Sequence, residues 1–216
     1  MTAPERPFPR QITRFLPHQR ERREGTRVDI AVVHAMAEHV RNPDERWGPV
    51  GTFDAWNWLD RKTWSAHVLC APNGDITICV PWDRTAFHAG QSRLGQREWL
   101  NDSSLGVEVL VPGTHDYDSF LRTIGIGHWL KGTPLDPLPP DPFTPAQYNA
   151  LGWLVACWTQ EYAGITQERI VGHADVSGPE VRSDPKWDPG PVWDWARFEE
   201  ARAYWEGWIQ AQEAVS

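Results

Sequence analysis

The sequence predicts an α/β domain in which a mixed central β-sheet is flanked by helices. Strand-like runs of β-branched residues alternate along the chain with segments of helical periodicity, which is typical of this class. An Asn-Gly pair at 73–74 between two strand-like runs indicates at least one antiparallel hairpin, so the sheet is expected to be mixed. The 216 residues show no break in composition and fit one sizeable core.

Three segments before residue 112 are expected to form strands. The run "RVDIAVVHAM" (27–36) is typical of a buried strand and is expected to carry His34 at its tip. The stretch "SAHVLCAPNGDITICVPWD" (65–83) predicts two strands around the turn, with Cys70 opposite Thr77. In "SSLGVEVLV" (103–111) the alternation places apolar side chains on one face and Glu108 on the other.

Helices are predicted in three further segments. The stretch 53–64, "FDAWNWLDRKTW", is the first. The second begins at "TPAQ" (144–147), where Thr144 is the expected N-cap, and its apolar residues recur at helical spacing on one face. The stretch 193–215 is expected to be a final amphipathic helix, and "ERIVGHADV" before it predicts a strand running into His173.

The expected organisation is an arginine-rich N-terminal surface arm, 1–27, followed by one domain, 28–216. Within the domain, 111–143 is rich in glycine and proline and is expected to be a long irregular excursion. The three cysteines are expected to be reduced, with Cys70 and Cys79 buried as small hydrophobic residues.

The charge of the chain excludes several classes of partner. A net charge of −8 argues against nucleic acid and against an anionic membrane surface, because both need a basic face. No apolar run is long enough for a membrane span, so membrane insertion is not expected. No secretory segment is recognisable at the N-terminus, so a cytoplasmic location is expected.

A set of metal-ligand residue types stands out. His34 and His173 end separate strand-like runs, and Asp188 lies in "KWDPGP" (186–191), where the prolines restrict the backbone. Two histidines and a carboxylate, with a position left for water, form a typical catalytic zinc site. The same residues are compatible with ordinary turn chemistry and with satisfied core or surface histidines, because no HExxH or CxxC spacing is present.

Several blocks of the sequence, in order, resemble the zinc-dependent N-acetylmuramoyl-L-alanine amidases. This family includes wall-recycling amidases, amidase-type phage lysins and peptidoglycan recognition proteins. The resemblance covers about 28–198 and implies their α/β fold. Its blocks are "VVHAM", "WSAHVLCAPNGDITICVPWDRTAFHAG", "NDSSLGVEVL", "IVGHADV" and "KWDPGPVWDWARF".

The resemblance implies a role for five residues. His34, His173 and Asp188 match the zinc ligands, which implies one Zn²⁺ per chain. Glu108 matches the carboxylate that orients the attacking water and takes its proton, and Lys186 matches the lysine that stabilises the oxyanion. Positions 186 and 188 share one side of an extended backbone, so the ammonium is expected beside the metal.

Other positions carry weaker expectations. His88, with its neighbour Phe87, is expected at the substrate cleft, and His67 is either a strand residue inside the site or a partner of a ligand. Asp175 and Asp184 are alternative third ligands. The remaining histidines are expected on the surface: His18, His39, His115 and His128.

The function that the resemblance implies is hydrolysis of the amide bond between N-acetylmuramic acid and L-alanine, in peptidoglycan or in soluble muropeptides. Two alternatives stay open: a recognition module without catalysis, and a zinc peptidase that cuts within the stem peptide. Both a wall-recycling enzyme and a phage lysin released through a membrane pore fit the sequence, and of the two the lysin is the preferred interpretation. The excursion 111–143, with Trp129, is a hypothetical lid or glycan-binding wall.

Overall fold

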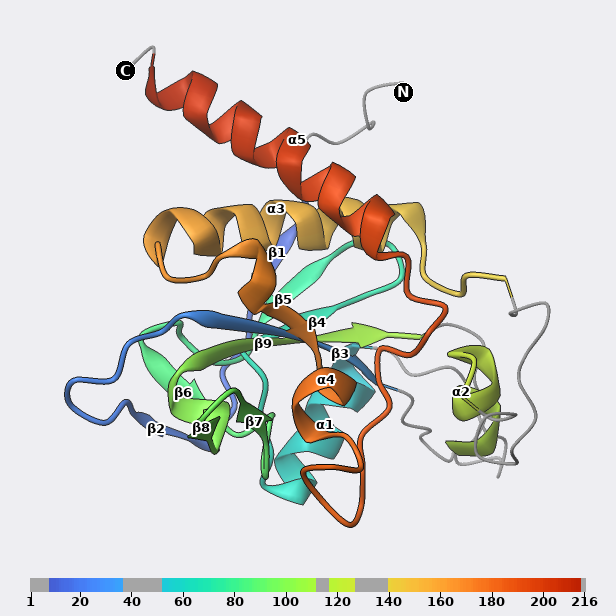
Figure 1. Ribbon diagram of the computed structural model, residues 1–216. Coiled ribbons are helices and arrows are strands. Elements are labelled where there is room, and N and C mark those ends of the chain that lie inside the picture. The colour runs from blue at the N-terminus through green and yellow to red at the C-terminus, as the bar shows by residue number, and fades with distance from the viewer. Residues whose placement is uncertain (1–7, 37–51, 112–116, 127–139, 215–216) are drawn as a thin grey trace.

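The structure is a computed structural model that describes residues 8–36, 52–111, 117–126 and 140–214. It confirms the predicted α/β class, with a mixed sheet that carries helices on both faces (Figure 1). The strand order of the main sheet is β1-β5-β4-β9-β3-β10. These six strands are β1 (Gln11–Thr13), β3 (Ile30–Met36), β4 (Val68–Cys70), β5 (Ile76–Ile78), β9 (Ser104–Leu110) and β10 (Ile170–Gly172).

Four neighbouring strands of this sheet are parallel, namely β4, β9, β3 and β10. Strand β5 is antiparallel to β4, and β1 is parallel to β5 at the edge. The pairing of β3 with β9 is the longest in the sheet and places His34 directly beside Glu108. Parallel strands gather functional side chains toward their carboxyl ends, and both residues lie in that half of their strands. His34 is not at the strand tip as predicted, because β3 continues to Met36.

The two faces of β9 differ as predicted. Its residues Leu105, Val107 and Val109 are fully buried in the largest hydrophobic cluster, under helix α3. Glu108 points to the opposite face, because successive side chains of a strand alternate. One strand therefore supplies both the main core and the wall of a cleft.

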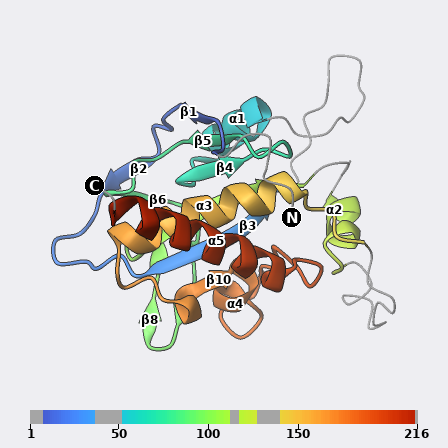
Figure 2. The same cartoon turned by 90° about the horizontal axis from the view of Figure 1, so that it is seen from above.

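Helix α3 (Pro145–Glu161) covers the apolar face and starts as predicted. Thr144 accepts a hydrogen bond from the Gln147 amide at 3.1 Å, and the Gln147 side chain accepts one from the Thr144 amide at 3.0 Å. The predicted inward face of α3 is buried, from Tyr148 to Trp158, and helix α5 (Trp195–Glu213) packs closely on the outer side of α3 (Figure 2). Gly152 permits this close approach, since a Cβ there would lie 2.7 Å from the Cβ of Ala201.

The opposite face carries two smaller apolar clusters. Helix α1 (Thr52–Lys62), predicted at 53–64, packs Ala55 and Leu59 against one end of this face. The short helix α4 (His173–Ser177) contributes Val176 to the other end. Their sheet partners are Met36, Leu69 and Leu110 in the first cluster and Ile30 and Val32 in the second. His34 lies between Val32 and Met36 on the same side of β3, so this polar side chain separates the two apolar clusters.

The N-terminal segment expected as a surface arm contributes strands. Strand β1 pairs with β5, and β2 (Gln19–Glu21) pairs with β6 (Arg84–Ala86) in a separate two-stranded sheet. Leu16 between them is fully buried. The described part of this segment, 8–27, therefore packs on the domain although β1 itself is exposed.

Two further predictions need correction. The excursion 111–143 is not wholly irregular, because it contains helix α2 (Tyr117–Thr123), while 112–116 and 127–139, with Trp129, lie outside the described residues. The β4–β5 hairpin sets Cys70 opposite Ile76 and not Thr77. The Ala71 amide donates to the Asp75 carbonyl at 2.9 Å, so the loop holds three residues instead of two.

The remaining elements are small. A hairpin is formed by β7 (Arg93–Leu94) and β8 (Arg97–Glu98), and short 3₁₀ turns occur at Leu100–Asp102 and Gln167–Arg169. Cys70 and Cys79 are fully buried, as predicted. Among the described helices, none combines the length and the hydrophobicity needed to cross a membrane.

Candidate metal centre and its cleft

The structure brings His34, His173 and Asp188 together from three separate elements. His34 comes from β3, His173 is the first residue of α4 directly after β10, and Asp188 lies in the loop before α5. One potential ligand atom from each residue lies within 4.8 Å of the other two. Asp188 Oδ2 is 3.5 Å from Nδ1 of His34 and 3.2 Å from Nδ1 of His173.

Backbone contacts fix the loop that carries Asp188. The amide of Ala35 donates to Asp188 Oδ2 at 3.2 Å, and the amide of Ala174 donates to the Asp188 carbonyl at 2.9 Å. Two residues on, Gly190 has a φ of +88°, and a side chain there would collide with the carbonyl of Ile124. The carboxylate is therefore anchored to both strand-derived ligands by the main chain.

Burial sets the charge states of these three residues. Burial, and then the neighbouring His173, lowers the pKa of His34 to about 4, so the imidazole is neutral at ordinary pH. Burial acts to raise the pKa of Asp188, but the neighbouring His173 outweighs it and leaves this pKa well below its usual range. A metal ion needs a neutral imidazole and an ionised carboxylate, so His34 and Asp188 are in the required protonation states.

The donor set and its spacing fit a zinc ion. Zinc takes nitrogen and carboxylate ligands at about 2.0–2.2 Å in tetrahedral geometry, which separates neighbouring ligand atoms by roughly 3.3 Å. The two separations from Asp188 Oδ2, 3.5 and 3.2 Å, are close to this value. Three protein ligands leave the fourth tetrahedral position for water or substrate, as in catalytic zinc sites.

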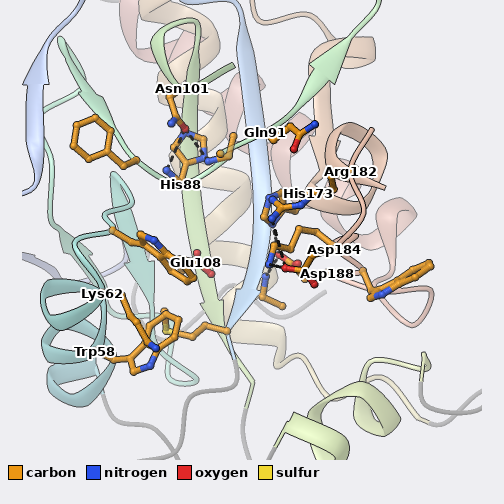
Figure 3. Close-up of a pocket in the computed structure, with 18 of the residues that line it drawn as sticks. Trp58, Lys62, His88, Gln91, Asn101, Glu108, His173, Arg182, Asp184 and Asp188 are labelled. Carbon is orange, nitrogen blue, oxygen red and sulfur yellow. Dashed lines mark hydrogen bonds and ion pairs between the residues drawn. The ribbon is translucent and has the colours of Figure 1, made fainter. Parts of the chain in front are cut away.

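Glu108 faces this group from the neighbouring strand. Its Oε1 lies 4.0 Å from Nδ1 of His34, and in Figure 3 Glu108 and Asp188 lie on either side of β3. Burial, and then the charge of Asp188, raises the pKa of Glu108 to about 8, although Lys186 acts to lower it. A carboxyl group with a pKa near neutrality can both accept and return a proton.

Lys186 and the two alternative aspartates have distinct surroundings. Lys186 lines the cleft. Its positive charge adds to the downward shift of the pKa of His34 and partly opposes the upward shift of the pKa of Glu108. Asp184 is 81% exposed at its side chain and lies 3.6 Å from the Lys186 ammonium. Asp175 accepts a hydrogen bond from the Gly172 amide at 2.7 Å. Neither aspartate belongs to the group of converging ligand atoms formed by the described residues.

A comparison with protein families shows the family to which the chain belongs. Residues 24–191 match the family model described as N-acetylmuramoyl-L-alanine amidase. This range is most of the chain and contains His34, Glu108, His173, Lys186 and Asp188. The chain belongs to this amidase family. The resemblance and the enzyme class predicted from the sequence are thereby confirmed.

Individual relatives agree with this assignment. The chain is 30% identical over 194 residues to the 1,6-anhydro-N-acetylmuramyl-L-alanine amidase AmpD of Haemophilus influenzae, covering 84% of this chain and 86% of that protein. A crystal structure of an AmpD derivative has a TM-score of 0.59 at 26% identity, covering 93% of this chain and 99% of that one. AmiD of Escherichia coli was solved with anhydro-N-acetylmuramic acid-L-Ala-D-γ-Glu-L-Lys. Its structure has a TM-score of 0.56 at 26% identity, and the match covers 84% of this chain and 61% of that one.

The amidase cleft has a volume of about 700 Å³ and opens onto the candidate metal centre (Figure 3). Phe87 and His88, predicted at the substrate cleft, both line it. His67 is fully buried behind them, where its Nδ1 accepts the Gly106 amide at 3.0 Å. His18 is partly exposed beside Asp60 at 3.1 Å, while His39, His115 and His128 lie outside the described residues.

Sequence reasoning missed part of the cleft wall of this amidase. Trp58 in α1 and Trp64 just after this helix stack edge to face with ring centres 5.2 Å apart, and both line the cleft. Lys62 and Arg182 also line it. The aromatic residues were visible in the predicted helix, but which face of that helix meets the cleft depends on its packing against the sheet.

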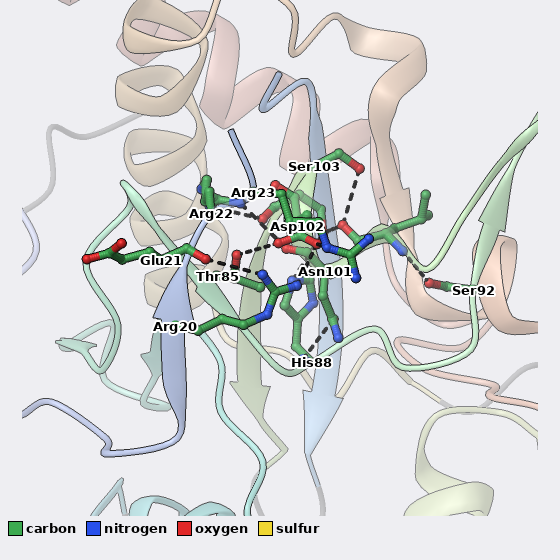
Figure 4. A network of polar contacts seen from close by, with 12 residues as sticks. Arg20, Glu21, Arg22, Arg23, Thr85, His88, Ser92, Asn101, Asp102 and Ser103 are labelled. Atoms are coloured by element: carbon green, nitrogen blue, oxygen red, sulfur yellow. Dashed lines mark hydrogen bonds and ion pairs between the residues drawn. The ribbon is translucent and has the colours of Figure 1, made fainter. Parts of the chain in front are cut away.

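A second missed feature is a polar network behind His88 (Figure 4). The Asn101 side chain accepts hydrogen bonds from the amides of His88 at 3.2 Å and Ala89 at 2.8 Å. The next residue, Asp102, is held by Arg20 at 2.6 Å and by Thr85 at 2.7 Å. Both residues lie in the recognised block "NDSSLGVEVL", in which the sequence analysis assigned a role to Glu108 alone.

Proposed function

We propose that this amidase holds one zinc ion per chain through His34, His173 and Asp188 and there hydrolyses the amide bond between N-acetylmuramic acid and L-alanine. The observation that carries the proposal is the convergence of three ligand atoms within 4.8 Å of one another at a cleft that Glu108 and Lys186 also line. A recognition module without catalysis needs neither a donor set with an open fourth position nor a partly buried carboxyl group beside it.

The residues around the ligands supply the proton transfers. A zinc ion bound there would lower the pKa of water toward neutrality and polarise the substrate carbonyl. Glu108, whose pKa burial raises to about 8, takes a proton from the attacking water and returns it to the alanine nitrogen as the amide bond breaks. The Lys186 ammonium stabilises the negative charge that develops on the carbonyl oxygen. Phe87 and the face of the His88 ring contact the substrate.

We infer that soluble muropeptides with an anhydro sugar are preferred to intact peptidoglycan. The support comes from relatives: AmpD of Haemophilus influenzae is named for a 1,6-anhydro-N-acetylmuramyl substrate, and AmiD was solved with an anhydro-muropeptide. Such a preference fits a wall-recycling role better than a lytic one. A lysin would be expected to degrade intact cell walls at least as fast.

Mass spectrometry of the products tests the proposal. The purified protein, with zinc and after chelation, is incubated with anhydro-muropeptides and separately with intact cell walls. Zinc-dependent release of free stem peptide with an N-terminal L-alanine supports the amidase reaction. Cleavage inside the stem would support a peptidase, and no product would support a recognition module. Faster release from cell walls than from soluble fragments would contradict the recycling role.

A further inference from the structure

A chain of hydrogen bonds leads from the main chain to the candidate ligand His34. The Ser104 hydroxyl lies 2.7 Å from the carbonyl oxygen of Leu100 and 3.2 Å from Nε2 of His88. On the other side of the His88 ring, Nδ1 lies 2.9 Å from Nε2 of His34. Ser104 is fully buried, and His34 is 1% exposed. Both ring nitrogens of His88 are therefore engaged inside the protein.

Simple proton counting fixes the direction of every bond in this chain. A carbonyl oxygen cannot donate, so the single hydroxyl proton of Ser104 points to Leu100. Ser104 Oγ must then accept from His88, which requires a proton on His88 Nε2. A neutral His88 has no second proton, so its Nδ1 accepts from His34 Nε2. His34 consequently carries its proton on Nε2 and has a bare lone pair on Nδ1.

We propose that Ser104 and His88 are positioning residues that fix the tautomer of His34, so that its Nδ1 lone pair faces the zinc position. Nδ1 is the nitrogen that lies 3.5 Å from Asp188 Oδ2 and 4.0 Å from Glu108. The inference rests on the proposed function, because it assigns this nitrogen to the metal. It adds two residues that do not contact the metal and gives His88 a role beyond contact with substrate.

The surroundings of His88 hold its ring in the required place. Gly106, opposite Val32 in the β3–β9 pairing, has no side chain, and a Cβ there would overlap the His88 ring. The His88 amide is bound by Asn101, and the His67 ring packs at 5.6 Å from the His88 ring. A ring packed this way can meet His34 and Ser104 at once, which a mobile surface histidine could not.

The second histidine ligand lacks an equivalent arrangement. Nε2 of His173 is buried and has no hydrogen-bond partner among the described residues. Metal-binding histidines usually donate their other ring N–H to a protein group, which orients the ring and fixes the tautomer. Among the described residues, His34 follows this rule through His88, so the preorganisation of the centre is concentrated on the β3 side.

The positioning role can be tested by comparing the zinc affinities of variants at two adjacent serines. Ser103 and Ser104 are both buried and both donate to the Leu100 carbonyl, but in the described structure only Ser104 also meets His88. Zinc affinity of the full chain is measured by competition with a chromophoric chelator. Ser104→Ala is expected to weaken zinc binding about tenfold or more, since loss of such partners typically costs 10- to 100-fold. Ser103→Ala is expected to bind zinc like the wild type.

A second pair of variants separates tautomer control from packing. Asparagine can place its side-chain oxygen near the position of the imidazole Nδ1 and accept from His34, whereas leucine cannot. His88→Asn is therefore expected to retain more zinc affinity than His88→Leu. Equal losses in both, or equal affinities of the Ser104→Ala and Ser103→Ala variants, would overturn the positioning role.

The tautomer itself is read from ¹⁵N chemical shifts of the histidine rings in the metal-free wild type near neutral pH. We expect His34 to be protonated at Nε2 and bare at Nδ1, and a proton on Nδ1 would overturn the inference. Because this spectrum is recorded without metal, it judges the tautomer even if the wild type fails to bind zinc. Failure to bind zinc would refute the proposed function instead.

Discussion

The two faces of strand β9 show how one element serves both stability and chemistry. Leu105, Val107 and Val109 are fully buried under α3, in the largest hydrophobic cluster of the protein described above. The residues between them face the other way: Gly106 leaves space for the His88 ring, and Glu108 lines the cleft. Alternation along the strand separates the two functions by a single residue step.

This difference indicates where the protein tolerates unfavourable burial. On the site face, His34 and His67 are buried and the Glu108 side chain is only 13% exposed, and desolvation is the main cause of the shift of the pKa of each group. Such groups oppose folding unless partners compensate. The apolar face has no such cost, so we expect mutations on the site face to alter function and mutations on the core face to alter stability.

The largest expected effect follows removal of a ligand. Asp188→Ala takes away the only anionic donor of the set and is expected to lower kcat by at least about 10³-fold, since the metal is worth several kcal/mol to the reaction. Bound zinc measured after dialysis should fall in parallel. Asp184→Ala is the matched control, because Asp184 is an exposed aspartate of the same loop. Loss of zinc in Asp184→Ala with retention in Asp188→Ala would reverse the assignment of the third ligand.

The corresponding change on the core face is Leu105→Ala. Leu105 is fully buried, so the cavity is expected to lower the free energy of unfolding by about 2–5 kcal/mol, measured by denaturant titration. Zinc content and kcat per folded molecule should stay near the wild type at low temperature. A large loss of kcat in the folded protein would show that the two faces are coupled through β9.

Lys186→Ala, in the cleft that the site face of β9 lines, distinguishes a loss of catalysis from a loss of bound metal. Loss of an oxyanion-stabilising donor is expected to reduce kcat by about 10²- to 10³-fold while bound zinc remains unchanged. Lys62→Ala removes another cleft-lining ammonium, and its effect should fall mainly on KM. Unchanged kcat in Lys186→Ala, with zinc bound, would exclude the proposed role of this lysine.

Local sequence signals predicted the elements whose side chains have a periodic pattern. The apolar run of β3, the alternation of β9 and the capping box of α3 were recognised and are present. Strands β1 and β2 were missed, because "QIT" and "QRE" carry no apolar pattern and are held by backbone pairing with distant strands. Strand order could not be predicted either, since parallel partners such as β3 and β9 are far apart in sequence.

The candidate site divides in a similar way. Residue type and the family motifs were enough to select His34, His173 and Asp188, which the fold brings together. The hydrogen bonds behind them were not predictable, because His88 meets residues 54 positions before it and 16 positions after it. The orientation of a ring and the direction of its hydrogen bonds depend on tertiary packing, which a motif does not encode.

The smallest expected effect is on the free energy of unfolding. It measures how much the partly buried carboxyl group of Glu108, on the site face of β9, destabilises the fold. Burial raises the pKa of Glu108 to about 8, so the native state holds this proton more tightly than the unfolded chain does. Its contribution to stability is therefore fully present below the ordinary glutamate pKa of 4.5 and is lost as the pH rises through about 8. Glutamine has a similar shape and no such proton, so Glu108→Gln should not suffer this loss.

In the metal-free protein we expect Glu108→Gln and the wild type to have similar free energies of unfolding near pH 5. Near pH 9 the variant should be the more stable of the two, because the wild type must then ionise a partly buried carboxyl group. Urea titrations at both pH values measure the difference, and other titrating groups cancel because both proteins share them. The same variant should lose most of its turnover, since glutamine cannot accept a proton. Equal stability at pH 9 would mean that the buried carboxylate is already compensated, and that the site face of β9 carries no energetic cost relative to the core face.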